Sequence, residues 1–313
     1  MSGHILALSG GVGGAKLAAG LAAVLPPERL SIVVNTGDDF EHLGLTICPD
    51  LDSVTYALAD LNDTDRGWGV KDETWQAMAM LRQAGGPDWF NLGDRDLGLH
   101  LTRAWRLRQG ETLSQATRFL TGNLGIAHPI IPMSDDPVRT QIETDEGVLD
   151  FQHYFVKEQC RPVAKAIRLT AADQAKISEG FAGALERQDL AAVVICPSNP
   201  YLSVDPILSL AGLRERFTAR KVPVIAVSPL VGGTALKGPL AKVMAELGRP
   251  VSNAAIAEHY AGLLDHLVID ATDAADAEGL RATGLCVTVA QTIMRNEDDR
   301  KQLAREVLTL AGG

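Results

Sequence analysis

Apolar residues gather along this chain in short continuous runs, separated by longer stretches of mixed character. The runs lie at 5–8, 30–35, 191–196, 221–229, 266–270 and 285–289. Such runs are typical of strands that are buried on both faces of a parallel sheet. Helix-prone stretches stand between them, such as 17–24 and the amphipathic 291–310. The pattern therefore predicts an α/β fold with a mostly parallel sheet.

The pattern changes between residues 126 and 185, where β-branched and aromatic residues alternate with Asp-Asp-Pro and Asp-Glu-Gly turns. We expect strands there at 126–133, 138–142, 148–156 and 164–169. They predict a smaller antiparallel subdomain at 126–185, inserted into a core formed by 1–125 and 186–313. Further helices are expected at 68–83, 111–120 and 253–264.

The first apolar run leads into a glycine cluster at 9–16, with the sequence SGGVGGAK, and then into a helix. Strand, glycine loop and helix N-terminus form the unit that binds phosphates in α/β proteins, because glycine lets backbone N–H groups approach an anion. Lys16 stands where a dinucleotide-binding fold has its third glycine, and it precedes Leu17 rather than the Ser or Thr of a P-loop. The cluster predicts an anion or nucleotide site; the alternative is merely a tight turn.

Acidic residues follow the second apolar run, at a strand end where open α/β sheets bind ligands. Asp38 and Asp39 could hold a metal ion or a ribose hydroxyl, or could cap the next segment. Asp50 adds a further carboxylate, and clustered carboxylates suit Mg²⁺ that also holds phosphates. Asp52, taken alone, is most simply a helix N-cap.

Two loops in the second half of the chain repeat the arrangement. Ser198 and Asn199 follow the run at 191–196, and their side chains can bond phosphate, ribose or a base edge. The glycine and lysine loop at 231–239 either closes over a nucleotide from the opposite side or is a flexible surface connection.

The segment 88–96 crowds acids, one arginine and two aromatic residues around a glycine turn. Arg95, between Asp94 and Asp96, either forms an internally satisfied ion-pair cluster or takes a phosphate while an aromatic neighbour stacks on a ring. His100 lies four residues after Asp96, hence on the same helix face. It is either a structural histidine or a ligand contact.

Composition narrows the class of protein. The chain has 313 residues, of which 46% are hydrophobic and 22% charged, which suits a soluble globular protein. A net charge of −10 argues against a nucleic-acid binder, since that affinity rests on clustered Lys and Arg. Four singly spaced cysteines and the lack of a leader or a long apolar run lead us to expect a cytoplasmic protein without membrane contact.

Several separated strings together resemble one family, the 2-phospho-L-lactate transferases of coenzyme F420 biosynthesis. They run in order over nearly the whole chain. The strings are SGGVGGAKL at 9–17, VVNTGDD at 33–39, CPDLDSVTY at 48–56, WGVKDETW at 68–75, LGDRDLGLH at 92–100, PMSDDPVRTQIET at 132–144, PSNPYLSVDPI at 197–207 and AVSPLVGG at 226–233. One glycine loop is weak evidence, but the ordered set is specific.

This resemblance implies a Rossmann-like core with helices on both faces of the sheet and a smaller β-containing subdomain. It also implies a Mg²⁺-dependent transfer of a phospholactyl-type group to the deazaflavin 7,8-didemethyl-8-hydroxy-5-deazariboflavin, or Fo. The ribityl 5′-hydroxyl of Fo would attack the β-phosphorus of a guanosine diphosphate-linked donor, and GMP would leave. The transferred group would be 2-phospholactate, phosphoenolpyruvate or 3-phosphoglycerate. The string PDWF at 87–90 looks like the bacterial branch and tilts the expectation toward the enolpyruvyl donor.

By the same resemblance we assign roles to residues. Asp39 and Asp50 are the expected catalytic and metal-binding carboxylates, with Asp50 alternatively the general base for the hydroxyl. The other expected substrate-binding residues are Ser9, Gly10, Gly11, Gly13 and Gly14 for the diphosphate, Ser198 and Asn199 for the guanosine, Asp94, Arg95 and His100 for the acceptor, and Asp52, Trp89 and Asn91 elsewhere in the site.

Two other functions stay open at this point. A nucleotide-sugar-binding regulator of related fold would bind without turnover, although it has less need of the acidic strings at 48–52 and 94–96. A nicotinamide dehydrogenase is disfavoured by Lys16 in place of the third glycine. The habit of the family suggests a homodimer.

Overall fold

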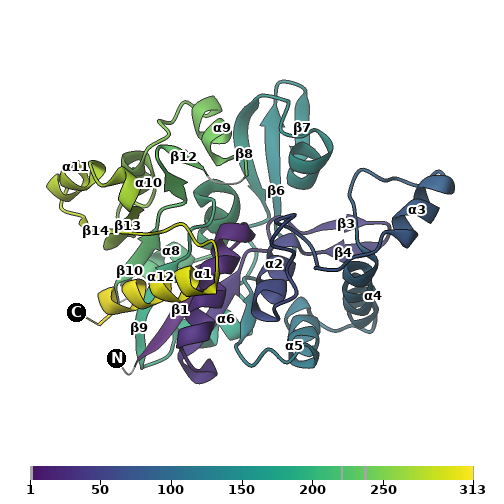
Figure 1. The fold of residues 1–313 in the computed structure, drawn as a ribbon, viewed down its shortest axis with the longest axis horizontal. Coiled ribbons are helices and arrows are strands. Elements are labelled where there is room, and N and C mark those ends of the chain that lie inside the picture. The colour runs from purple at the N-terminus through teal and green to yellow at the C-terminus, as the bar shows by residue number, and fades with distance from the viewer. Residues whose placement is uncertain (1–2, 220, 236–237, 313) are drawn as a thin grey trace.

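A seven-stranded sheet runs through the centre of the protein, as seen in a computed structural model that describes residues 3–219, 221–235 and 238–312 (Figure 1). Its order is β14-β13-β10-β9-β1-β2-β5, and each neighbouring pair is parallel. The strands are β1 (His4–Ser9), β2 (Leu30–Val34), β5 (Ile130–Pro132), β9 (Leu190–Ile195), β10 (Val224–Val227), β13 (His266–Asp270) and β14 (Cys286–Ala290). The predicted α/β class with a parallel sheet is confirmed.

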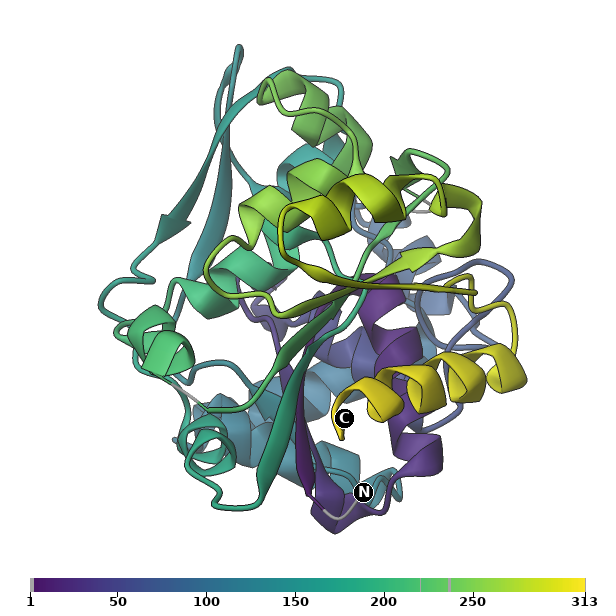
Figure 2. The same cartoon turned by 90° about the vertical axis from the view of Figure 1, so that its left-hand side faces the viewer.

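Helices cover both faces of this sheet, because successive side chains of a buried strand point to opposite faces. Ile5 and Ala7 of β1 join the hydrophobic cluster of α1 (Gly11–Val24), α2 (Pro49–Leu58) and α12 (Glu297–Leu310). Leu6 and Leu8 join the cluster on the other face. That cluster takes side chains from α6 (Glu179–Leu185), α7 (Asp205–Leu208), α8 (Leu213–Ala219), α9 (Leu240–Glu246), α10 (Asn253–His259) and α11 (Asp276–Ala282). Figure 2 shows α1 and α12 side by side on their face.

A three-stranded antiparallel sheet stands apart from the main one, in the order β7-β6-β8. It consists of β6 (Arg139–Thr144), β7 (Gly147–Asp150) and β8 (Ala164–Thr170). The expected strand at 126–133 is not part of it, because β5 pairs in parallel with β2 in the main sheet. The expected strand at 148–156 was also too long. After Asp150 the chain coils into the π-helical turn η2 (His153–Lys157), since its buried side chains recur at helical rather than alternating spacing.

The segment 68–83 also differs from its prediction, because only α3 (Gln76–Gln83) is helical. Gly69 and Asp72 have φ values of 74° and 57°, which a right-handed helix cannot contain. The Asp94 carboxylate then starts α3 by accepting the N–H groups of Gln76 and Ala77 at 2.9 Å. The residues before Gln76 are therefore a loop.

Two short hairpins and two further helices complete the fold: β3 (Phe40–His42) with β4 (Leu45–Ile47), β11 (Leu230–Val231) with β12 (Thr234–Ala235), α4 (Asp94–Arg108) and α5 (Leu113–Asn123). Helices expected at 111–120, 253–264 and 291–310 are present with shifted ends. Leu236 and Lys237, in the predicted loop at 231–239, lie outside the described residues. Within the described part of the chain, no helix is both long and apolar enough to span a bilayer.

Candidate active site

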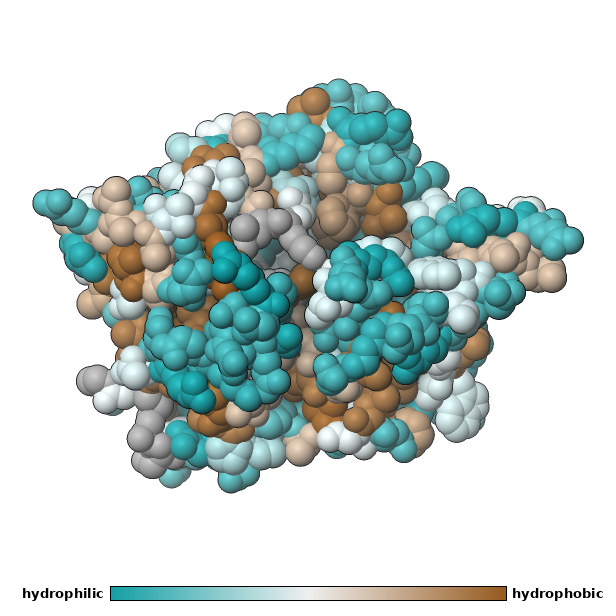
Figure 3. Space-filling model, in the orientation of Figure 1, coloured by the Kyte–Doolittle hydropathy of each residue, from teal (hydrophilic) through white to brown (hydrophobic). Residues whose placement is uncertain are grey.

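A cavity of about 790 Å³ opens at the carboxyl ends of the central strands. The loops that follow five of the strands, β1, β2, β9, β10 and β14, contribute to its lining through Gly10, Asp38, Ser198, Ser228 and Thr292. Figure 3 shows this face of the molecule hollowed near its centre. Ligands of open α/β sheets bind at this edge, so the cavity is the natural candidate site.

Most of the residues predicted from the sequence line this cavity. They are Gly10, Gly11, Gly13, Asp50, Asp52, Asn91, His100, Ser198 and Asn199. The others do not line it, and they are Ser9, Gly14, Asp39, Trp89, Asp94 and Arg95. The structure thus places the first nine residues around one cavity. Their individual roles in binding or catalysis stay predictions.

The glycine cluster makes one wall, where β1 turns into α1. Gly11 has a φ of 63°, and its N–H donates to Asp50 Oδ1 at 2.6 Å. The Gly10 N–H donates to Ser198 Oγ at 3.0 Å. A Cβ on Gly13 would lie 2.4 Å from the Pro197 carbonyl oxygen, so the loop after β9 packs directly on this turn. The Gly10 and Gly11 amides are thus already taken by protein side chains, and the following amides of the first turn, those of Val12 and Gly13, point an anion-binding helix end at the cavity.

Two buried carboxylates, those of Asp38 and Asp50, line the cavity beside that wall. Asp50 Oδ2 accepts from Asn35 Nδ2 at 2.9 Å, and Asn35 Oδ1 accepts the Gly37 N–H at 2.8 Å. Burial and then the neighbouring Asp50 carboxylate raise the pKa of Asp38 well above its ordinary value, and burial also raises the pKa of Asp50. Asp38 Oδ1 is buried without a hydrogen-bond partner. Burial therefore disfavours the charged form of both carboxyls, and the charge of Asp50 adds to this effect at Asp38.

Asp39 lies outside the cavity, although it is adjacent to Asp38 in the chain. Burial raises its pKa to about 8, while Cys48, Arg139 and Arg103 act in the opposite direction. Its Oδ1 atom is buried without a partner. The structure thus sets Asp38, rather than Asp39, beside Asp50.

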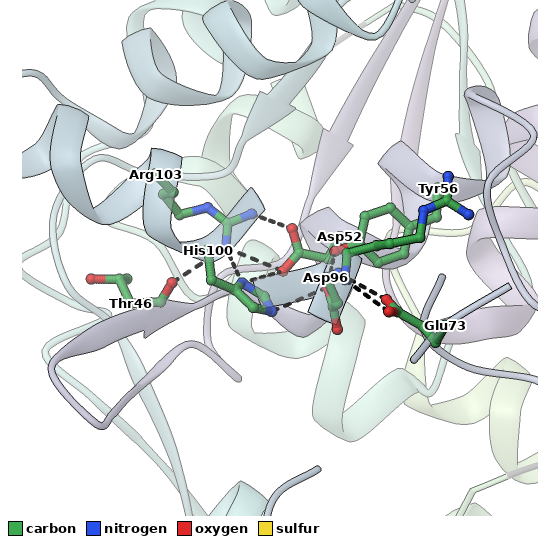
Figure 4. Close-up of polar contacts among 8 residues, drawn as sticks. Thr46, Asp52, Tyr56, Glu73, Asp96, His100 and Arg103 are labelled. Atoms are coloured by element: carbon green, nitrogen blue, oxygen red, sulfur yellow. Dashed lines mark hydrogen bonds and ion pairs between the residues drawn. The ribbon is translucent and has the colours of Figure 1, made fainter. Parts of the chain in front are cut away.

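A buried ion pair supports the floor of the cavity (Figure 4). Arg103 of α4 makes a bidentate contact with Asp52 of α2, and both side chains are nearly inaccessible to solvent. Arg103 Nη1 also lies 3.2 Å from His100 Nδ1. Since the guanidinium can only donate, Nδ1 accepts and the proton of His100 is on Nε2.

The same network reaches the cavity through Asp96. Its Oδ1 accepts from the Tyr56 hydroxyl and from His100 Nε2, the latter at 3.2 Å. Burial disfavours its charge, but the hydrogen bonds from His100 and Tyr56 and the charge of Arg103 together lower the pKa of Asp96. Glu73 accepts the Asp96 N–H at 2.8 Å and so fixes the first turn of α4. Asp96 is therefore an ionised carboxylate held in one orientation at the cavity wall.

The remaining predicted residues of this segment have local structural contacts. Asp94 caps α3, as described above, and Arg95 donates to the Lys71 carbonyl oxygen at 2.6 Å. Trp89 packs between His42 and His153, with ring centroids 5.2 and 4.5 Å apart. None of these three side chains lines the cavity.

Aromatic side chains form another part of the cavity lining. Phe151 and Phe155 stack with centroids 5.5 Å apart and planes 6° apart, and Phe90 and Trp68 also line the cavity. Such walls suit a flat ring. The cavity thus joins an anion-binding end to an aromatic end.

Several lining or supporting residues received no role in the final sequence-based assignment, chiefly Asn35, Asp38, Tyr56, Asp96 and Arg103, although Asp38 had been named as a possible metal or ribose ligand. Two had a signal in the sequence: Asp96 by its spacing of four from His100, and Asp38 by its place after a strand. The other three depend on which helices the fold packs together, and no local pattern marks them.

The fold and the cavity define an α/β enzyme of the Rossmann-like type that acts on small molecules. The chain belongs to the CofD family, 2-phospho-L-lactate transferase, whose model matches residues 5–308. It is a transferase of coenzyme F420 biosynthesis, as the resemblance predicted.

Among similar proteins, the 2-phospho-L-lactate transferase of Methanosarcina mazei is 37% identical over 97% of this chain and 99% of its own length. The phosphoenolpyruvate transferase of Streptomyces griseus is 39% identical over 98% of both chains. A solved UPF0052-family protein of Bacillus halodurans shares the fold, with a TM-score of 0.64 and 17% identity over 98% of this chain and all of its own.

Proposed function

We propose that the protein transfers a three-carbon phosphate group from a guanosine diphosphate-linked donor to the ribityl 5′-hydroxyl of Fo. The hydroxyl oxygen attacks the β-phosphorus, the bond from that phosphorus to the bridging oxygen breaks, and GMP leaves with the bridging oxygen. The hydroxyl proton passes to a carboxylate. Family membership supports the transfer, and the two ends of the cavity support the pairing of a nucleotide with a ring.

The glycine cluster suits the donor. The first-turn amides of α1 and the side chains of Ser198 and Asn199 line the same end of the cavity, where they can hold the diphosphate and the guanosine. Lys16 lies at this end too and donates to the Met294 carbonyl oxygen at 2.8 Å. Its charge favours phosphate binding there.

Asp38 and Asp50 fit a Mg²⁺ ion. Asp38 has an unpartnered oxygen, and the raised pKa of each carboxyl reflects a charge that lacks compensation. No group of three or more His, Cys, Asp or Glu residues among the described residues is placed to hold a metal alone. Mg²⁺ commonly takes one or two carboxylates and completes its shell with substrate phosphates and water. When bound, it neutralises charge on the diphosphate.

Asp50 is also the carboxylate best placed to orient the attacking hydroxyl. Its two oxygens are held by the Gly11 N–H and by Asn35, so the carboxylate cannot rotate freely. A fixed acceptor next to the diphosphate aligns the hydroxyl, and positioning supplies much of the rate of phosphoryl transfer. The sequence-based assignment of Asp39 to the metal stays a prediction.

The identity of the three-carbon group is part of the proposal. Relatives named for 2-phospholactate and for phosphoenolpyruvate are similar to this chain to nearly the same degree. The PDWF string at 87–90 favours the enolpyruvyl donor. In the structure this string lies beside the cavity, with Phe90 in its wall.

The observation that carries the proposal is that one cavity unites a glycine turn, two buried carboxylates and aromatic side chains in its lining. Incubation with Fo, Mg²⁺ and each of the three guanylylated donors tests it. We expect GMP release that depends on Fo, fastest with the enolpyruvyl donor. If no donor yields GMP, the transfer proposal fails, and the result favours the alternative of a nucleotide-sugar-binding regulator without turnover. Calorimetry with NAD, for which we expect no binding, tests the dehydrogenase alternative.

Two further expectations belong to the proposal. The habit of the family supports a homodimer, which light scattering of the purified chain tests. The singly spaced cysteines, all of them free in the structure, support a reducing cytoplasmic location. Fluorescence imaging of a tagged chain tests the location.

A further inference from the structure

The Asp96 carboxylate presents one unused oxygen to the cavity. Its Oδ1 takes both donors, Tyr56 and His100, and no hydrogen bond or ion pair to Oδ2 occurs among the described residues. The residue is only 7% exposed, yet it lines the cavity. Figure 4 shows the second oxygen of Asp96 pointing away from the network. An ionised, nearly buried oxygen of this kind needs a hydrogen-bond donor from a ligand.

Among the residues that the structure describes, the neighbouring donors are already engaged elsewhere and do not bind Asp96 Oδ2. Arg103 is committed to Asp52, and Tyr56 and His100 are committed to Oδ1. The neighbouring wall is aromatic, with Phe90 contributing to the cavity. A flat ring with an N–H or O–H on its edge would satisfy both features of this corner.

Asp96 lies on α4, but the position of its partner Tyr56 along α2 indicates which part of an acceptor lies there. Tyr56, its hydrogen-bond partner, follows Asp50 in this helix by six residues, which is about 9 Å along the axis. If the reacting hydroxyl lies at Asp50, the ribityl chain occupies this interval. The ring system then reaches Asp96.

We propose that Asp96 determines acceptor specificity by accepting a hydrogen bond from the imide N–H of the deazaflavin pyrimidinedione ring. This inference rests on the proposed function. Tyr56, His100 and Arg103 are positioning residues: they hold Asp96 ionised and leave Oδ2 as an acceptor toward the cavity. A ring without a donor at that edge leaves a buried charge unpaired and is rejected.

The test is the affinity for Fo, followed by the fluorescence of the deazaflavin, in wild type and Asp96→Asn. In the variant the amide oxygen keeps the bonds from Tyr56 and His100, which turns its NH₂ group toward the cavity. The NH₂ group of the asparagine then faces the imide N–H of the ring, and two donors cannot form a hydrogen bond with each other. We expect Fo to bind about 10- to 100-fold more weakly, with the affinity for GDP unchanged.

Methylated acceptors locate the contact. Fo methylated on the imide nitrogen should bind wild type about 10-fold or more weakly than Fo, and Asp96→Asn should add little to that loss. Fo methylated on the 8-hydroxyl should retain the full effect of the substitution. If the 8-methoxy compound instead shows the coupling with Asp96, the assignment to the imide is wrong.

Control measurements distinguish a failure of the Asp96 inference from a failure of the proposed function. Asp189→Asn removes an acid before β9 at the opposite edge of the sheet and should bind Fo as wild type does. Equal affinity of wild type and Asp96→Asn for Fo would overturn the inference while the proposed function stands. Failure of wild type to bind Fo would overturn both. If Asp96→Asn does not fold, the two methylated acceptors still decide with wild type alone, since a greater loss for the 8-methoxy compound contradicts the proposal.

Discussion

Replacing Asp39 with Asn should stabilise the folded protein, and by more as the pH rises. Asp39 is 4% exposed, and its pKa is raised from 3.8 to about 8, chiefly by burial. Below pH 4 the carboxyl is protonated in both the folded and the unfolded chain, so its ionisation does not change the free energy of unfolding. Between about pH 4 and 8 only the unfolded chain ionises, and the folded state loses about 1.4 kcal/mol per pH unit.

The size of the effect follows directly. At pH 5 the loss is about 1.6 kcal/mol and at pH 7 it is about 4.4 kcal/mol, because the pH lies about 1.2 and about 3.2 units above the unfolded pKa. An asparagine has the same shape and no proton to hold. The free energy of unfolding of Asp39→Asn should therefore exceed that of wild type by an amount that grows over this range.

Guanidinium unfolding at pH 5 and pH 7, with EDTA to remove metal ions, measures the two differences. Asp189→Asn is the matched control, because its carboxylate is exposed and paired with Arg187, so its stability difference should not grow with pH. A difference for Asp39→Asn that is the same at both pH values, or a variant less stable than wild type at pH 7, would refute the reasoning.

The same variant tests the sequence-based role of Asp39. If Asp39 binds Mg²⁺, as the resemblance led us to expect, its replacement should raise the Mg²⁺ concentration needed for half-maximal transfer. If Asp38 and Asp50 suffice, this concentration should not change.

Other changes test the site more directly. Asp50→Ala should abolish transfer while the circular dichroism stays native; near-normal turnover would remove Asp50 from the mechanism. Gly13→Ala places a Cβ 2.4 Å from the Pro197 oxygen, so it should weaken GDP binding in calorimetry and cost about 1–3 kcal/mol of stability, and unchanged GDP affinity would contradict the packing argument. Arg103→Met leaves Asp52 buried without its partner and should lower the free energy of unfolding by about 3–5 kcal/mol, whereas a loss below about 1 kcal/mol would count against the ion pair.

Most of the parallel core was predictable because six of its seven strands, all but β5, are continuous apolar runs that the sequence alone marks as buried strands. The strand at Ile130–Pro132 was placed in the wrong sheet, since it is short and its partner β2 is about a hundred residues away in the chain. The turn at His153–Lys157 was mistaken for a strand because aromatic and β-branched residues favour strands, and here the burial of Tyr154 in the core overrides that local preference.

The residues of the candidate site likewise fall into those that the sequence could locate and those that it could not. Gly11, Asp50 and Ser198 follow strands or open helices, and those places can be found from the sequence. The choice between Asp38 and Asp39, or between Asp94 and Asp96, depends on which way one residue of a pair points. That direction is set by tertiary partners such as Asn35, Tyr56 and His100, which no local pattern reveals.

Mass spectrometry of the deazaflavin product tests the central claim most directly. With wild-type protein, Mg²⁺ and a guanylylated donor, we predict that Fo gains the mass of the donor's three-carbon phosphate group, with one GMP released for each Fo converted. Unmodified Fo after incubation with all three donors, or GMP release without any change in Fo, would contradict the account.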